Sequence, residues 1–133
     1  MSATNLQNFS GDVQIRGTTF IKANTATDNL AIGSLAGEAS QGASSVAVGN
    51  LAGSNAQGAQ SVAIGQSAGK VSQGAYSTAM GFEAGSGDQG ANSVAVGVNA
   101  GLNAQGTNST AVGFDAGKVS QGAQSVAVGI DAG

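Results

Sequence analysis

The chain contains no cysteine, no histidine, no proline and no tryptophan among its 133 residues. The lack of cysteine excludes a disulfide scaffold and a thiolate metal site. The lack of histidine removes the commonest general base and the commonest metal ligand. Charged residues make up only 8% of the chain and the net charge is -3, so no basic patch is available for nucleic-acid phosphates. We therefore expect no cofactor, no metal site and no nucleic-acid partner.

Two further absences concern membranes and export. No apolar run approaches the roughly 18 residues that a membrane-spanning helix needs, so no membrane insertion is expected. The segment that begins at Met1 lacks the positively charged and apolar regions of a signal peptide. This start favours a component that is assembled inside a cell.

What the chain does have is 23 glycines and a repeat of 16 residues. The copies follow one another without insertion or deletion, and the seventh is incomplete; they begin at Asn29, Ser45, Ser61, Ser77, Ser93, Ser109 and Ser125. Residues 70–73 return as residues 118–121, three units later, which indicates duplication of a three-unit block. A fixed short period of this kind indicates a solenoid.

Within each repeat, positions 2 to 4 alternate branched residues with alanine, as in a β-strand. Glycines at positions 5, 9 and 14 are placed to form corners. We predict an all-β fold for residues 29–133: a parallel β-solenoid, or β-roll, of about seven coils. Each coil would hold two short strands and two turns, with coils about 4.8 Å apart.

The residues at one repeat position form a column along the stack. Columns 2 and 4 carry branched residues that share one face, whereas column 3 is alanine in every copy and lies on the opposite face. We expect another chain to pack close against that alanine column. The core of a single coil is thin, and ordering the backbone costs about 1–2 kcal/mol per residue. We therefore also predict a homo-oligomer whose chains are intertwined or packed side by side.

Three other columns are candidates for a role. Glutamine fills position 13, and we predict that its amides form a structural hydrogen-bonded ladder rather than a catalytic site; its members are Gln41, Gln57, Gln73, Gln89, Gln105 and Gln121. Column 6 is polar in the first three copies and then apolar, which predicts extra core, packing between chains, or a contact stripe for a receptor or fibre segment; its apolar members are Phe82, Val98, Phe114 and Ile130. Column 7 holds Glu83, Asp115 and Asp131, a solvated acidic edge or, alternatively, a Ca²⁺ site.

Residues 1–28 do not follow the repeat. Segments 12–16 and 18–22 alternate as strands, and the large apolar residues of the region cluster there: Phe9, Val13, Ile15, Phe20 and Ile21. We predict an N-terminal cap, because a solenoid needs its first coil covered. The alternative is a segment that docks on an upstream assembly such as a virion base.

The repeat resembles the head repeat of trimeric autotransporter adhesins, the YadA-like head, and similar repeats of phage and large-virus fibre proteins. The matching residues are 61–65, which read SVAIG, together with Ala68, Gly74 and Ala75, and their equivalents in the other copies. The usual head repeat has about 14 residues, and the additional two here fall between Ala68 and Gly74, where we expect a longer turn. The resemblance implies a homotrimer of left-handed parallel β-rolls and a role in adhesion or as a fibre.

We predict a structural protein rather than an enzyme, since no residue pair offers a nucleophile with its base. The preferred function is a rigid rod of a trimeric phage or viral fibre, located on the virion surface, that takes part in host attachment. Its partners would be a cell-surface receptor or other fibre proteins. The alternative is the head of a bacterial trimeric autotransporter adhesin on the cell surface, and an ice-binding solenoid is a third, less favoured reading because Thr78, Thr107 and Thr110 form no regular array.

Overall fold

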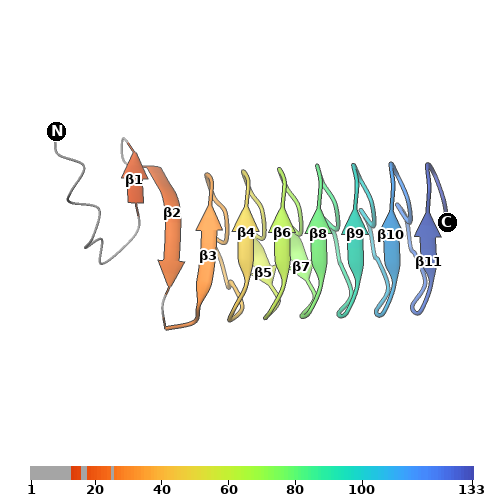
Figure 1. Cartoon of the computed structure of the whole chain (residues 1–133), viewed down its shortest axis with the longest axis horizontal. Helices are drawn as coiled ribbons and strands as arrows, with labels where there is room; N and C mark the ends of the chain where they lie inside the picture. The colour runs from red at the N-terminus through yellow and green to blue at the C-terminus, as the bar shows by residue number, and fades with distance from the viewer. Residues whose placement is uncertain (1–12, 16–17, 25) are drawn as a thin grey trace.

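The computed structural model describes residues 13–15, 18–24 and 26–133, and in this part of the chain every regular element is a β-strand. The strands stack into a rod whose coils follow one another from the N-terminal to the C-terminal end (Figure 1). Nine of them form one continuous sheet in the order β1-β2-β3-β4-β6-β8-β9-β10-β11, and β5 pairs with β7. Their bounds are β1 Val13–Ile15, β2 Thr18–Asn24, β3 Asn29–Ile32, β4 Val46–Val48, β5 Asn55–Gln57, β6 Val62–Ile64, β7 Val71–Gln73, β8 Thr78–Met80, β9 Val94–Val96, β10 Thr110–Val112 and β11 Val126–Val128.

The stack follows the 16-residue period without a shift of register. In the pairing of β4 with β6, Val46 faces Val62 and Ala47 faces Ala63, and the strands run parallel. The predicted parallel β-solenoid is therefore confirmed. It has about six turns rather than the seven predicted, because the seventh repeat supplies only β11 and the residues up to Gly133.

The strands turn the opposite face inward from the one we predicted, since we expected the alanines of column 3 to lie on the outside of the coil. The alanines of column 3 are buried inside the coil, where they meet the equally buried alanines of column 8, while the branched residues of columns 2 and 4 point outward. The expectation that the alanine column forms a contact between chains is wrong, since those methyl groups are the core of each coil. The core alanines are Ala31, Ala36, Ala47, Ala52, Ala63, Ala68, Ala79, Ala84, Ala95, Ala100, Ala111, Ala116 and Ala127.

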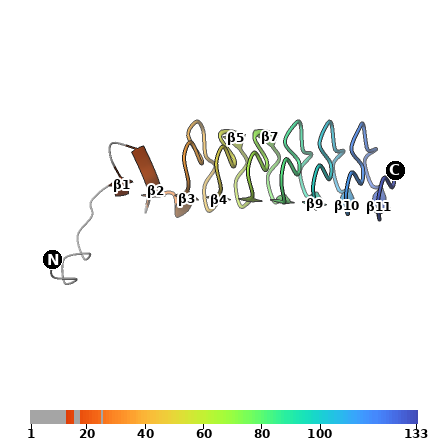
Figure 2. The same cartoon turned by 90° about the horizontal axis from the view of Figure 1, so that it is seen from above.

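A narrow cross-section explains this inversion. Figure 2, which views the rod from above, shows the strands of the nine-stranded sheet along one side of the rod and β5 and β7 along the other. One glutamine side chain spans the distance between the two sides, as from Gln73 to the carbonyl oxygen of Val62. A side chain larger than alanine at position 3 would meet the alanine of position 8 across the interior, and close-packed interiors do not accept extra volume cheaply. The larger apolar side chains are therefore on the outside.

The corners rely on left-handed backbone at ordinary residues as well as at glycine. The backbone at position 7 is left-handed in all seven copies, and at position 16 in all six copies that contain it. Ser67, for example, has a φ of 58° and Tyr76 a φ of 57°. Glycine is required where coils approach most closely. A Cβ on Gly65, whose φ is 126°, would lie 2.4 Å from the carbonyl oxygen of Gly81 in the next coil.

The second side of the coil is less regular than the first. Named strands occur there only as β5 and β7, and the other coils are joined by isolated bridges such as that between Gln89 and Gln105. The longer turn predicted between Ala68 and Gly74 therefore contains a strand, because β7 occupies three of those residues.

Of the two N-terminal strands, β2 runs against the direction of the solenoid strands and β1 runs with them. Strand β1 pairs antiparallel with β2, and β2 pairs antiparallel with β3, where Lys22 faces Ala31 and Asn24 faces Asn29. The two strands predicted before the repeat thus correspond to β1 and β2. Strand β2 pairs with the edge of β3 that faces away from β4. The capping role remains a prediction, and Phe9 of the predicted apolar cluster lies outside the described residues.

Candidate functional site

The glutamine column is part of the interior of the solenoid. Gln73 is buried and its amide nitrogen donates a 2.8 Å hydrogen bond to the carbonyl oxygen of Val62, across the same coil. The same bond recurs from Gln57 to Val46 and from Gln105 to Val94, at 2.8 Å each. The amides therefore stack in register but bond to the main chain, which corrects the predicted amide-to-amide ladder.

The first position of the repeat is occupied by a second internal polar column. The Ser61 hydroxyl is fully buried and donates a 2.6 Å hydrogen bond to the carbonyl oxygen of Gly58. Ser77 makes the same bond to Gly74. These hydroxyls close the corner at position 14 and are shielded from solvent, so they serve the fold and offer no accessible nucleophile.

Partly exposed apolar side chains line the outside of the nine-stranded sheet. We define the outer face as the side chains of columns 2, 4 and 6 from the first repeat to the last. Columns 2 and 4 are partly exposed along the rod and most exposed at its C-terminal end, at Val126 and Val128; column 2 is Leu30, Val46, Val62, Thr78, Val94, Thr110 and Val126, and column 4 is Ile32, Val48, Ile64, Met80, Val96, Val112 and Val128.

Column 6 follows each strand of this face after a single glycine. Its polar members Ser34, Asn50 and Gln66 are exposed and follow β3, β4 and β6. Its apolar members are also exposed, with 44% of Phe82, 40% of Val98, 51% of Phe114 and 77% of Ile130 accessible. The structure thus brings the predicted stripe together on consecutive coils of the C-terminal half.

Charge is absent from the outer face. All charged residues of the repeat region stand at positions 7, 10 and 12, on the other sides of the coil: Glu38, Lys70, Glu83, Asp88, Asp115, Lys118 and Asp131. An uncharged, apolar strip of this length on a soluble chain is typical of a surface that another molecule covers.

The acidic column is tied into side-chain bonds at Asp115. Its carboxylate accepts a 2.8 Å hydrogen bond from the Asn99 amide and a 2.9 Å ion-paired bond from the Lys118 ammonium. These two donors, Lys118 first, hold the pKa of Asp115 below its usual value. Across residues 13–15, 18–24 and 26–133, no group of three His, Cys, Asp or Glu side chains that could hold a metal ion comes together.

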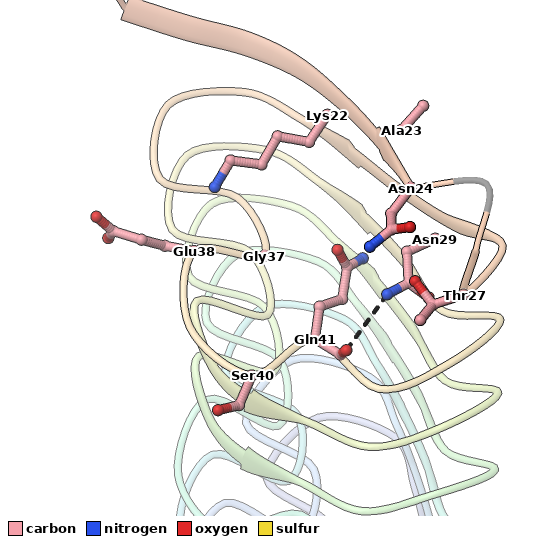
Figure 3. A pocket seen from close by; sticks show the side chains of 9 residues that line it. All are labelled: Lys22, Ala23, Asn24, Thr27, Asn29, Gly37, Glu38, Ser40 and Gln41. Carbon is pink, nitrogen blue, oxygen red and sulfur yellow. Dashed lines mark hydrogen bonds between the residues drawn. The ribbon is translucent and has the colours of Figure 1, made fainter. Parts of the chain in front are cut away.

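An opening of about 280 Å³ lies at the N-terminal end of the rod, between β2 and the first coil. It is lined by Lys22, Asn24, Thr27 and Gln41, among others. Figure 3 shows the Asn29 amide bonded to the carbonyl oxygen of Gln41 at its base, a contact of 3.3 Å, and the Glu38 carboxylate pointing away. In later coils the carbonyl of the position 13 glutamine accepts a bond from the main-chain N–H of the preceding coil, as Gln57 does from Gly42. In the first coil the Asn29 amide makes this bond to Gln41 instead. Among the described residues, the opening lies at the N-terminal end of the solenoid interior.

Comparison with known protein families gives one result. Residues 40–68 and 89–116 match the family model of the YadA head domain repeat. The resemblance inferred from the sequence is confirmed for these two segments. No curated protein and no solved structure matches the chain significantly.

Each matched YadA head segment begins near the glutamine position and ends at a column 8 alanine, so it contains two strands of the nine-stranded sheet. The coils between and after the two matches have the same register, core alanines and corner backbone as the matched ones. Within the described residues there is no helix that is long and apolar enough to cross a membrane.

The sequence analysis identified column 6 as a candidate contact surface, but it did not predict that the side chains of columns 2 and 4 lie on the outside of the coil. The signal that would have found them is the pairing of two invariant alanine columns, 3 and 8, with a glutamine column. A glutamine that reaches across a coil leaves room only for methyl groups, so the branched residues must face outward.

Proposed function

We propose that this chain is a trimeric, surface-exposed attachment rod, built like the head of a trimeric autotransporter adhesin. The observation that carries this proposal is the outer face, an apolar and charge-free strip on a repeat that matches the YadA head domain. Lateral association of copies through that strip would remove it from water. The resemblance implies that three copies associate.

The energetics favour such association. Inside one coil the apolar core consists of alanine, which contributes little burial, whereas full burial of a valine or isoleucine side chain stabilises by about 1.5–3 kcal/mol. Columns 2 and 4 are only partly buried in the single chain. Covering them with a second copy would add apolar burial at every coil along the rod.

The family match supports an extracellular location, as in a bacterial adhesin head. The virion fibre remains our prediction from the sequence, and both settings use the same rigid rod to hold a binding surface away from its base. The role is structural rather than catalytic: the repeat serines are buried in main-chain hydrogen bonds, and Asp115 is paired with Lys118.

Sedimentation equilibrium across a dilution series tests the assembly. We expect a species near three times the chain mass of 12.6 kDa. The double variant Val62→Lys/Ile64→Lys places two charges on the outer face of one coil and is expected to lower the mass toward that of the monomer. Ser72→Lys, an exposed position on the opposite side, is the matched control and is expected to leave the mass unchanged.

A folded species of 12.6 kDa at every concentration would overturn the proposed assembly. Attachment is tested separately, with fluorescent beads that carry the wild-type rod or the double-lysine variant. Retention on cultured cell layers by the wild type alone is the expected result. Equal loss of both by washing would contradict the attachment role while leaving the trimer intact.

A further inference from the structure

A strictly repeating outer face has a register problem. Columns 2 and 4 carry nearly the same residues on every coil, so two copies could slide by one coil, about 4.8 Å, and recover almost the same contacts. Pairing is weakly specified wherever a slip leaves the apolar pattern unchanged. An assembly of defined length therefore needs a feature of the outer face that differs along the rod.

Column 6 is that feature. It is polar at Ser34, Asn50 and Gln66, and then apolar from Phe82 onward, so it divides the rod into two halves (Figure 1, from β8 on). Its apolar side chains are also more exposed than most of columns 2 and 4 within the rod. They are therefore accessible to a neighbouring copy.

We propose that the apolar half of column 6 is the contact that sets copies of this chain parallel and in register, with Phe82, Val98, Phe114 and Ile130 each meeting its own equivalent in a second copy. This inference rests on the proposed homo-oligomer. It commits the outer face to one occupant, another copy of this chain.

The pattern itself discriminates among arrangements. With copies parallel and in register, all four apolar side chains meet apolar partners. A slip of one coil sets Phe82 of one copy against Gln66 of the second copy. It also leaves Ile130 of the second copy beyond the end of the first. An antiparallel arrangement that overlaps the whole rod sets Phe114 against Asn50 and Val98 against Gln66, so only Phe82 keeps an apolar partner. An antiparallel arrangement shifted by three coils would pair Phe82 with Ile130 and Val98 with Phe114, but it would leave columns 2 and 4 uncovered on three coils of each copy.

The area and the charge of the outer face are both consistent with a second copy as its occupant, provided that column 6 takes part in the contact. Seven strands about 4.8 Å apart, with columns 2 and 4 about 7 Å apart along each strand, make a strip of only about 200 Å². A stable interface buries about 800 Å² on each partner. Column 6 widens the strip, and a phenylalanine can bury 150–250 Å². A surface without charge is matched by an identical surface without charge, and by no strongly charged partner.

The absence of cysteine from the chain makes the test clean. In Val98→Cys, oxidation is expected to join two chains of each oligomer by a disulfide, because the bond requires Cα atoms about 4.4–6.8 Å apart. Asn108→Cys, at an exposed corner of the same coil and away from the outer face, is the matched control and is expected to stay uncrosslinked. A mixture of Gln66→Cys and Phe114→Cys chains, three coils apart, is expected to give no mixed dimer.

The variant Phe82→Ser/Val98→Asn/Phe114→Gln, which makes column 6 polar on three further coils, provides a second readout. Combined with Ile130→Cys it is expected to lose most of its disulfide yield, while the otherwise unaltered Ile130→Cys chain keeps it. The outcomes separate the two proposals. A monomer in sedimentation equilibrium overturns the rod and this inference together. An oligomer in which Val98→Cys does not crosslink, or in which the mixed dimer forms as readily, overturns the register contact alone.

Discussion

The amide nitrogen of Gln73 lies 2.8 Å from the carbonyl oxygen of Val62, on the opposite side of the same coil. This one bond ties the two sides of the solenoid together, and it recurs in every complete coil. The Val62 carbonyl also belongs to the parallel pairing of β6 with β8, so the glutamine amide adds a second, cross-coil bond to a main-chain group of the sheet. The width of the coil is therefore the reach of a glutamine side chain.

Replacing this glutamine is expected to destabilise the rod. Gln73→Met keeps the length and most of the volume but removes the bond that joins the two sides of the coil, at a cost of about 0.5–1.5 kcal/mol. The measurement is the free energy of unfolding in urea at a fixed protein concentration. Gln60→Met makes the same change at an exposed corner and is expected to stay within about 0.5 kcal/mol of the wild type; equal effects of the two would contradict a bridging role.

The glycines at position 14 offer a matched pair that differs only in what lies beside them. A Cβ on Gly58 would lie 2.5 Å from the main-chain nitrogen of Ala75, whereas a Cβ on Gly122 would meet nothing within 4 Å. Neither residue has a positive φ, so backbone strain does not separate them. Gly58→Ala is expected to cost about 3 kcal/mol or more, because main-chain atoms must move.

Gly122→Ala is expected to leave the thermal unfolding midpoint of the 133-residue chain nearly unchanged. Both variants are compared by circular dichroism during heating. If Gly122→Ala proved as harmful as Gly58→Ala, contact between coils would not be the reason for glycine at this position.

The inverted alternation predicts opposite tolerance at adjacent residues of β8. Ala79→Val adds volume to the fully buried interior and is expected to destabilise by about 1–3 kcal/mol. Thr78→Val, its neighbour on the outer face, is expected to change the unfolding free energy by no more than about 0.5 kcal/mol. Urea titration of the two variants side by side decides which column is the core, and the reverse order would place the branched residues inside.

Acid is expected to weaken the Asp115 cluster. The pKa of Asp115 is lowered in the folded chain, chiefly by the hydrogen bond from Lys118 and then by that from Asn99. A carboxyl with a depressed folded pKa contributes stability above its ordinary value of 3.8, and loses that contribution as the pH falls through the folded value. The thermal midpoint of the wild type should therefore fall more steeply than that of Asp115→Asn as the pH is lowered below about 4.

Salt supplies the control for that comparison. Because the pair is at the surface, raising the ionic strength to about 1 M shortens the screening length to about 3 Å and should narrow the difference between the two proteins. An identical acid dependence of the wild type and Asp115→Asn at low salt would show that the pair makes no contribution to stability.

Most of the architecture of this protein is determined by its sequence alone. The unbroken 16-residue period sets the register of every strand pair, because each residue stacks on its equivalent in the next coil. The glycines and the β-alternation identify corners and strands, and column 6 is visible as a polar stretch followed by an apolar one. The resemblance to the YadA head repeat is also legible in the residues themselves, without any coordinates.

The tertiary structure decided which side of the alternation faces inward. A period of two assigns residues to two faces but does not say which face is the core, and the usual preference for burying larger apolar residues points the wrong way here. The distance across the coil settles it: Gln73 spans the interior, Ala63 and Ala68 fill the remaining space, and Val62 and Ile64 must lie outside. That distance arises only when the two sides of the coil close on each other, so no local pattern could contain it.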